Sequence, residues 1–324
     1  MSIIEFYSIV DLNVQIEYEN QQLAEEITRA FHDYFFTTKN ASVLDSYNLT
    51  LRFKNNDFYI KAPEAAQEIY ASSCLRVFKD ENFYYLISGD SLFQLDLGTS
   101  LGIGLLDSAF WERHPRSKQD FLMLSLLWLL RQHGVYALHA NGVVKNDVGI
   151  LIVGDTGKGK STTALSLIRQ GWGYLSDDVT LIRHTLDGIE AIAFLKGFSF
   201  DSSLVNCYPE LNKPSSFNEQ KRFLDIKQIY PGRFRHSCFP KALIFPEIVS
   251  NDKSELIPID RTKALVLLAE NSGGIMVDKE IVIKQMEVLK RLAYQTSSYK
   301  LLAGRDLYEE SERISEILLD LATN

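Results

Sequence analysis

The segment from Ile150 to Ile168 constrains the fold more than any other stretch, because a short apolar run passes through a glycine-rich loop into a segment of helical periodicity. The loop begins at Gly154, and Gly159-Lys160-Ser161 follows after four further residues. This is the GxxxxGK[ST] pattern of a phosphate-binding loop in the strand–loop–helix setting that it requires. The alternative is a glycine-rich turn that fits by chance, and the flanking segments argue against it.

The residue types of this loop suit the binding of a nucleoside triphosphate. Glycines let backbone N–H groups face an anion, and the helix that follows adds the positive end of its dipole. Lys160 is expected to reach the β- and γ-phosphates, and the Ser161 hydroxyl is expected to bind Mg²⁺. The residues expected to contact ATP are Gly154, Asp155, Thr156, Gly157, Lys158, Gly159, Lys160, Ser161 and Thr162.

Length and charge limit the remaining possibilities. A chain of 324 residues predicts two domains, which we place at 1–117 and 118–324. The net charge of −8, without a dense run of Lys or Arg, argues against nucleic acid or an anionic membrane as the principal partner. Three dispersed cysteines argue against a disulfide framework or a clustered zinc site, and the N-terminus shows no secretory pattern, so we expect a cytoplasmic protein.

The first hundred residues predict a small α+β unit that carries no chemical motif. Helical spacing predicts a helix over 21–36, and alternation about an Asn-Asn-Asp turn predicts a β-hairpin over 47–61. Further short strands are expected at 76–79, 82–88 and 91–97. Glycines and a proline predict an irregular connector over residues 101–117.

Past this connector the pattern is that of an α/β domain. An apolar run within 118–132 predicts a buried helix, too short at about ten apolar residues to cross a bilayer. Residues 137–144 and the strand that feeds the loop predict a hairpin. Further along, a strand is expected at 242–245, and helices are expected at 262–269, 282–293 and 309–321.

Two adjacent carboxylates, Asp177 and Asp178, interrupt a strand predicted over 174–182. Side chains of a regular strand alternate between faces, so both cannot point the same way unless the strand is distorted. Unpaired charges are costly in a buried strand, so the pair is explained if a cation or a substrate hydroxyl meets it. An acidic strand end in solvent is the alternative.

Basic residues gather downstream in this otherwise acidic chain. Arg222, Arg233 and Arg235 are candidates for contacts to substrate or phosphate, and an ordinary solvated face explains them equally well.

Taken together, Leu138-His139-Ala140-Asn141-Gly142-Val143, the loop and Ser176-Asp177-Asp178 resemble the HPr kinase family of bacterial serine kinases. That family also has a histidine at the start of its nucleotide domain, a phosphate-binding loop, and an Asp-Asp pair after the next helix. The resemblance is clear over about residues 137–182. Residues 1 to about 130 look more like divergent HPr kinase-like proteins found with peptide-modifying gene clusters, including kinases of lasso peptide precursors.

The resemblance implies a nucleotide domain of the HPr kinase and phosphoenolpyruvate carboxykinase type, with a smaller N-terminal α+β domain that helps bind substrate. It implies an ATP- and Mg²⁺-dependent kinase that forms homo-oligomers and phosphorylates a serine-type hydroxyl on a peptide or protein. Asp177 would be the general base, Asp178 and Ser161 would bind Mg²⁺, and Lys160 would stabilise the transferred group. For His139, a chemical role and the orientation of an aspartate are both open.

One part of the family pattern is not matched. The family's metal-binding glutamate lies in a glycine- and arginine-rich stretch, whereas Glu210 and Glu219 fall in a different setting. Two alternative functions also stay open, namely a kinase of free serine or a sugar, and a nucleotide-binding regulator without catalysis. An intact Asp177-Asp178 pair favours catalysis over binding alone.

Overall fold

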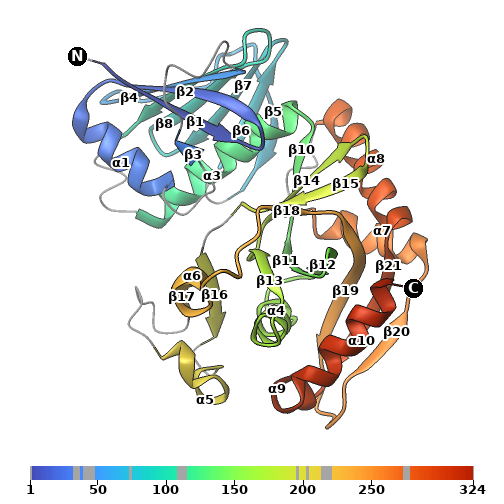
Figure 1. The fold of residues 1–324 in the computed structure, drawn as a ribbon. Helices are drawn as coiled ribbons and strands as arrows, with labels where there is room; N and C mark the ends of the chain where they lie inside the picture. The colour runs from blue at the N-terminus through green and yellow to red at the C-terminus, as the bar shows by residue number, and fades with distance from the viewer. Residues whose placement is uncertain are drawn as a thin grey trace. The chain divides into compact units, whose positions relative to one another are not determined.

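The computed structural model is a mixed α/β protein with several sheets (Figure 1). It describes residues 2–31, 37–38, 48–72, 75–107, 115–194, 197–201, 204–212, 221–272 and 278–323. The chain folds into two compact units, Met1–His133 and Gly134–Asn324. The boundary follows the helix at 115–132, so this helix belongs to the first unit, whereas the sequence-based boundary assigned it to the second.

The first unit is built on a nine-stranded sheet in the order β3-β1-β2-β4-β9-β8-β7-β6-β5. Neighbouring strands are antiparallel except that β4 is parallel to both β2 and β9. The strands are β1 Ile3–Ile9, β2 Leu12–Tyr18, β3 Thr37–Thr38, β4 Leu49–Asn55, β5 Gln67–Ala71, β6 Arg76–Asp80, β7 Phe83–Ser88, β8 Ser91–Asp96 and β9 Leu101–Leu106.

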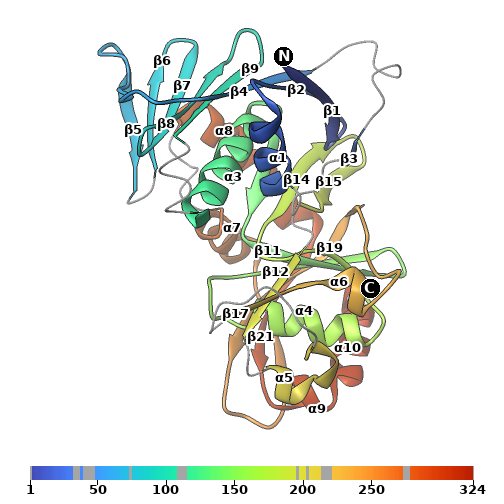
Figure 2. The same cartoon turned by 90° about the vertical axis from the view of Figure 1, so that its left-hand side faces the viewer.

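Two helices, α1 (Gln21–Phe31) and α3 (Pro115–Gln132), pack against each other in this unit (Figure 2). Helix α1 lies on β2 and β4, and the Trp128 ring of α3 meets the Tyr84 ring of β7 edge to face at 5.6 Å. An ion pair of 2.8 Å between Lys118 and Glu26 joins the helices. The predicted buried helix is thereby confirmed. No helix in the described part of the chain has the length and apolar character to cross a membrane.

Two predictions for this unit were wrong. Residues 49–55 do form a strand, but no return strand follows at 56–61, so there is no hairpin. Residues 101–106 are not a connector but strand β9. The helix predicted over 21–36 is confirmed as far as Phe31, and 32–36 lie outside the described residues.

The second unit has a central six-stranded sheet in the order β13-β11-β12-β19-β21-β20, beside a four-stranded sheet β10-β14-β15-β18 and a pair β16-β17. Strands β12, β19 and β21 are parallel, and β11 and β12 form the predicted hairpin. The strands are β10 Val135–Leu138, β11 Ala140–Lys145, β12 Val148–Val153, β13 Gly173–Ser176, β14 Thr180–Thr185, β15 Gly188–Ile192, β16 Gly197–Asp201, β17 Lys221–Asp225, β18 Ser237–Cys238, β19 Pro240–Ile248, β20 Glu255–Pro258 and β21 Ser297–Ala303.

Helices cover the central sheet and fix its core. Helices α4 and α10 contact one another and β12, while α8 contacts β19 and β21 and the four-stranded sheet. Ile150, Ile152 and Ile244 pack with Leu165 of α4 and Leu318 of α10 in one buried cluster. The helices are α4 Lys160–Arg169, α5 Leu204–Cys207, the 3-10 turn η2 Pro209–Leu211, α6 Ile226–Ile229, α7 Arg261–Glu270, α8 Lys279–Gln295, α9 Asp306–Glu309 and α10 Ser311–Thr323.

The helices predicted at 262–269, 282–293 and 309–321 are confirmed as α7, α8 and α10. The strand expected at 242–245 lies within β19. The carboxyl end of the buried strand β12 leads directly into the glycine-rich loop and then into α4, as the pattern requires.

Candidate functional site

The glycine-rich loop, residues 154–159, joins β12 to α4 with its backbone open to a ligand. Gly157 and Gly159 have φ values of +84° and +96°, a region that favours glycine because a Cβ strains it. Among the described residues no side chain caps the N-terminus of α4 at Gly159, so the first amides of the helix are not used by a cap. A helix N-terminus of this form suits an anion.

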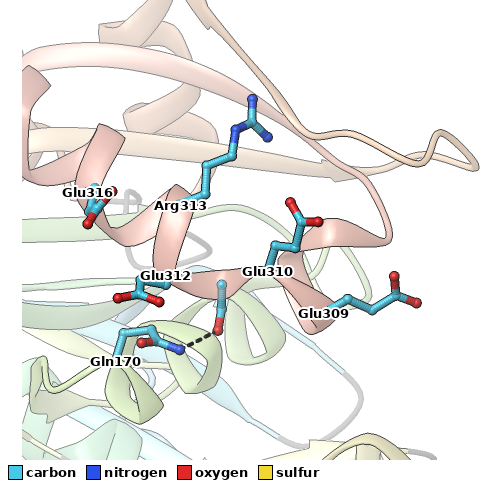
Figure 3. A pocket seen from close by; sticks show the side chains of 7 residues that line it. Gln170, Glu309, Glu310, Glu312, Arg313 and Glu316 are labelled. Atoms are coloured by element: carbon cyan, nitrogen blue, oxygen red, sulfur yellow. Dashed lines mark hydrogen bonds between the residues drawn. The ribbon is translucent and has the colours of Figure 1, made fainter.

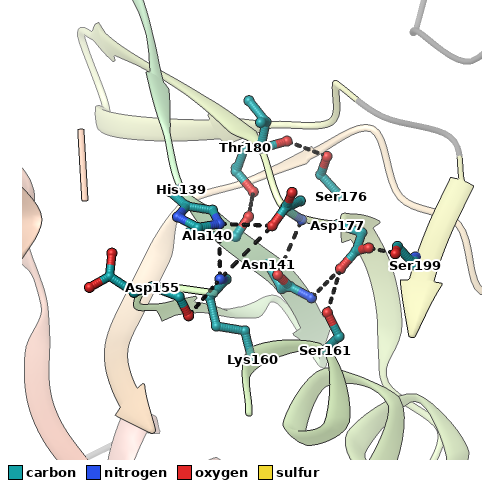
Figure 4. Close-up of polar contacts among 12 residues, drawn as sticks. His139, Ala140, Asn141, Asp155, Lys160, Ser161, Ser176, Asp177, Thr180 and Ser199 are labelled. Carbon is teal, nitrogen blue, oxygen red and sulfur yellow. Dashed lines mark hydrogen bonds and ion pairs between the residues drawn. The ribbon is translucent and has the colours of Figure 1, made fainter. Parts of the chain in front are cut away.

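Lys160, the first residue of α4, turns its side chain back under the loop and is only 5% exposed. Its Nζ atom lies 3.3 Å from the carbonyl oxygen of Asp155, 3.0 Å from His139 Nε2 and 3.9 Å from Asp178 Oδ1 (Figure 4). A buried ammonium group surrounded by acceptors is held at one point, close to the loop and to one aspartate.

His139 lies between β10 and β11, at the step from one sheet to the other, and its Nε2 is 2.8 Å from Asp178 Oδ1. The same nitrogen cannot donate a proton to Asp178 and accept one from Lys160 at once. The contact with Asp178 needs a proton on Nε2, whereas the contact with Lys160 needs the Nε2 lone pair, so the two contacts belong to different tautomers of the ring.

Asp177 is almost fully buried, with 2% exposure, and its carboxylate accepts three hydrogen bonds. Oδ1 accepts from Asn141 Nδ2 at 2.6 Å and from Ser161 Oγ at 3.0 Å, and Oδ2 accepts from the Ser199 backbone N–H at 2.6 Å. Burial raises the pKa of Asp177 to about 7, since it outweighs these hydrogen bonds, which lower the pKa, and the neighbouring charge of Asp178 raises it further. Asp177 thus exchanges a proton near neutral pH.

The chain bends sharply at this pair, so the predicted strand over 174–182 is two strands, β13 and β14, with the aspartates between them. Asp178 adopts φ +62°, and the Val179 N–H donates to the Asp177 carbonyl oxygen at 2.6 Å. Because of this distortion, the two carboxylates contact different residues. Asp177 meets Ser161, whereas Asp178, with 56% of its side chain exposed, meets His139 and Lys160.

Asn141 was not predicted as a site residue, yet it holds both aspartates. Its side chain is fully buried on β11, where Nδ2 donates to Asp177 and Oδ1 accepts from the Asp178 backbone N–H at 3.2 Å. Asn141 therefore fixes one carboxylate and supports the left-handed backbone of the other. A signal was present in the sequence, because a polar amide in a buried strand needs hydrogen-bond partners.

The three predicted arginines lie on β17 and in the segment between α6 and β18. The Arg222 backbone pairs with Phe200 in the β16-β17 sheet, and its side chain is outside the described residues. The guanidinium group of Arg233 donates to the Gly171 carbonyl oxygen at 2.6 Å, and that of Arg235 donates to two carbonyl oxygens of its own loop. These contacts hold Arg233 and Arg235 to the backbone, and a role of the three arginines in substrate binding stays a prediction.

The donor set suits Mg²⁺ better than a transition metal. Within the described ranges no group of three or more His, Cys, Asp or Glu is placed to hold a metal. The Ser161 hydroxyl and the two carboxylates supply oxygen ligands, and Mg²⁺ commonly takes one or two such ligands together with water and substrate phosphates. Of the two downstream glutamates compared with the family's metal-binding glutamate, Glu210 accepts hydrogen bonds from Arg169 and Tyr230. The other, Glu219, lies outside the described residues.

Fold and site together define an α/β protein with an open glycine-rich loop at the end of a buried strand and a histidine, a lysine and two aspartates beside it. No family model matches the chain. It is 32% identical over 100 residues to the HPr kinase/phosphorylase of Chlorobium phaeovibrioides, which is 31% of this chain and 28% of that protein. It is 34% identical over 92 residues to that of Chlorobium limicola, 28% of this chain and 26% of that protein.

These matches confirm the resemblance expected from the motifs: the chain is similar to HPr kinase/phosphorylases over less than a third of the length of these curated relatives. Among solved structures, the HPr(Ser) kinase/phosphatase from Coxiella burnetii matches at 15% identity and a TM-score of 0.30, over 57% of this chain and 98% of that one.

Proposed function

We propose that this chain is an ATP- and Mg²⁺-dependent kinase that transfers the γ-phosphoryl group to a serine-type hydroxyl on a peptide or protein. The observation that carries the proposal is the convergence of Lys160, His139, Asp178, Asp177 and Ser161 beside an open glycine-rich loop. The similarity to HPr kinase/phosphorylases supports it. The assignment of the second unit as a nucleotide domain of the HPr kinase and phosphoenolpyruvate carboxykinase type belongs to the same proposal.

In this proposal the loop amides and Lys160 bind the triphosphate and stabilise negative charge on the group in transit. The acceptor oxygen forms a bond to the γ-phosphorus, the bond from that phosphorus to the ADP oxygen breaks, and the hydroxyl proton passes to Asp177. A carboxylate with a pKa of about 7 is suited to accepting a proton at neutral pH. Asp178 and Ser161 would hold Mg²⁺, which supplies positive charge between the phosphates.

The contact between Ser161 and Asp177 supports a second assignment, in which Asp177 binds the metal and Asp178 accepts the proton. In nucleotide-binding loops of this type the serine and a carboxylate share the metal, and Ser161 Oγ lies 3.0 Å from Asp177, not beside Asp178. The exposed Asp178 would then accept the proton. A Mg²⁺ titration of the transfer rate in Asp177→Asn and Asp178→Asn separates the two, since the variant that lost the metal ligand needs more Mg²⁺ for its remaining activity.

The proposal is tested by incubation with γ-labelled ATP and Mg²⁺ and two separate pools, one of serine-containing peptides and proteins and one of free serine and sugars. Mass spectrometry then locates the added phosphate. Phosphoserine in the first pool supports the proposal. Product in the metabolite pool alone would assign a small-molecule kinase, and ATP binding without product in either pool would assign a regulator. Homo-oligomerisation and substrate binding by the first unit stay predictions.

A further inference from the structure

Strand β16 lies against the aspartate pair and has one edge with which no described strand pairs. In the described part of the chain, β16 pairs with β17 alone as a two-stranded ribbon. Phe198 and Phe200 anchor β16, since both side chains are buried in the core cluster that includes residues of α4. Ser199 lies between them, so its half-buried side chain faces the other side of the strand. The core thus holds this edge in a fixed place.

Two contacts show which backbone groups of β16 face the edge. The Ser199 N–H donates to Asp177 Oδ2 at 2.6 Å (Figure 4), and the Gly197 carbonyl oxygen accepts from the Tyr174 hydroxyl at 2.9 Å. In an antiparallel pair, residues alternate between those that bond the partner strand and those that face away from it. Ser199 and Gly197 therefore face away from β17, and so does Asp201, two residues further along β16.

At Ser199 a carboxylate takes the place of a neighbouring strand. The Asp177 oxygen accepts the N–H bond that a carbonyl oxygen of a third strand would accept. Beyond this point the edge continues to Asp201. A peptide paired with that stretch would lie about 4.8 Å from β16, the usual spacing of strands, and would begin directly beside Asp177.

The hollow at the start of α10 offers no such access to the aspartates. Its described lining includes four glutamates, Arg313 and Gln170, the C-cap residue of α4 (Figure 3). Helix α4 begins at Lys160 beside the loop, and its 10 residues span about 15 Å. The hollow is separated from the aspartate pair by about the length of this helix, so a hydroxyl bound there does not meet the pair.

We propose that the edge of β16 from Ser199 to Asp201 binds the serine-bearing segment of the substrate in extended form, as an added strand. This inference rests on the proposed function and adds the conformation of the substrate and the mode of its recognition. Main-chain hydrogen bonds supply the affinity in such a complex. The hydroxyl is presented beside the aspartate pair, whichever of the two accepts the proton. A serine held within a helix is then a poor acceptor.

The first test uses the wild-type protein and a serine peptide that it phosphorylates in the peptide pool. One backbone nitrogen at a time is methylated, at each of the three residues on either side of the serine. Alternate N–H groups of a paired strand face its neighbour. On the side of the serine that lies along the edge, methylation should therefore raise the KM for the peptide about 10-fold or more at alternate residues, the effect of one lost hydrogen bond. The KM for ATP should not change.

Equal effects at all methylated residues, or no effect at any, would overturn the inference while leaving the proposed function intact. If no peptide is phosphorylated at all, the proposed function and this inference both fail.

Asp201→Pro tests the edge from the side of the protein. Proline removes the Asp201 N–H, which faces away from β17, so the ladder between the two strands is kept. We expect the KM for the peptide to rise about 10-fold or more with the KM for ATP unchanged. Asp201→Ala is the matched control, because it keeps the N–H, and its KM for the peptide should stay close to that of wild type. An unchanged KM in Asp201→Pro, or equal increases in both variants, would refute the role of this edge. The methylation series on wild type stands even where a substitution unfolds the chain.

Discussion

The buried carboxyl of Asp177 makes the stability of the ligand-free protein depend on pH. Burial raises its pKa from 3.8 to about 7. The folded chain therefore binds a proton that the unfolded chain has released between these two values, so the free energy of unfolding falls as pH rises through that window. The full difference corresponds to about 4 kcal/mol at about 1.36 kcal/mol per pKa unit, of which about 3 kcal/mol falls between pH 5 and pH 8.

Asp177→Asn removes this titration. The substitution replaces one carboxylate oxygen, which accepts hydrogen bonds, by an NH₂ group, which donates them. Asn141, Ser161 and the Ser199 N–H all donate to the native side chain, so the NH₂ group faces a donor. We therefore expect a cost of about 1–3 kcal/mol at low pH for a donor left facing a donor. At pH 8 that cost is offset, because the variant has no buried charge to accommodate.

The assay is urea unfolding between pH 5 and pH 8, without Mg²⁺ or nucleotide, for wild type, Asp177→Asn and Ser166→Ala. Ser166 forms a buried hydrogen bond of 2.7 Å with Tyr208, so its loss lowers stability without altering a carboxyl group. Wild type and Ser166→Ala should lose about 3 kcal/mol more than Asp177→Asn across this range. If the free energy of unfolding changed equally with pH in all three proteins, the raised pKa of Asp177 would be refuted.

Three further substitutions separate the parts of the site. Lys160→Ala removes the buried ammonium group and should weaken ATP binding by about 10-fold or more and lower turnover; unaltered kinetics would count against the loop assignment. Asn141→Ala should lower kcat by about 10- to 100-fold with the KM for ATP unchanged, because only the aspartates lose their support; a change confined to KM would deny it a positioning role. Gly159→Ala places a Cβ at φ +96° and 3.1 Å from Ile248, and should lower stability in urea by about 1–3 kcal/mol; a variant as stable as wild type would show that the loop tolerates the strain.

The parts of the site predicted from sequence were those with local signals. The loop motif is defined by the spacing of residues within one continuous segment, and the aspartate pair was recognised as two charges in a strand predicted to be buried. The Ser199 contact could not be predicted, because it uses a backbone N–H that any residue would supply and comes from a strand of a separate small sheet.

The fold errors have a common physical cause, since alternation reveals a strand but not its partner. Strand β4 pairs in parallel with β2 and β9, both distant in sequence, and not with residues just after it. In β9 the glycines predicted as breakers serve packing. A Cβ on Gly104 would lie 2.4 Å from the Phe53 ring, and one on Gly102 would lie 2.6 Å from the Phe93 ring. Gly102 and Gly104 leave room for aromatic rings from neighbouring strands, which composition alone does not reveal.

The central claim is that this cluster transfers a phosphoryl group and does not merely hold a nucleotide. The most direct measurement compares transfer from γ-labelled ATP to a serine-containing protein or peptide pool, and ATP affinity, in the same preparations of wild type and Asp177→Asn. We predict that the variant binds ATP within a few-fold of wild type while its transfer rate falls by about 10²- to 10⁴-fold, since proton acceptance is lost and the phosphate-binding loop is kept. Equal transfer rates in the two proteins would contradict the account.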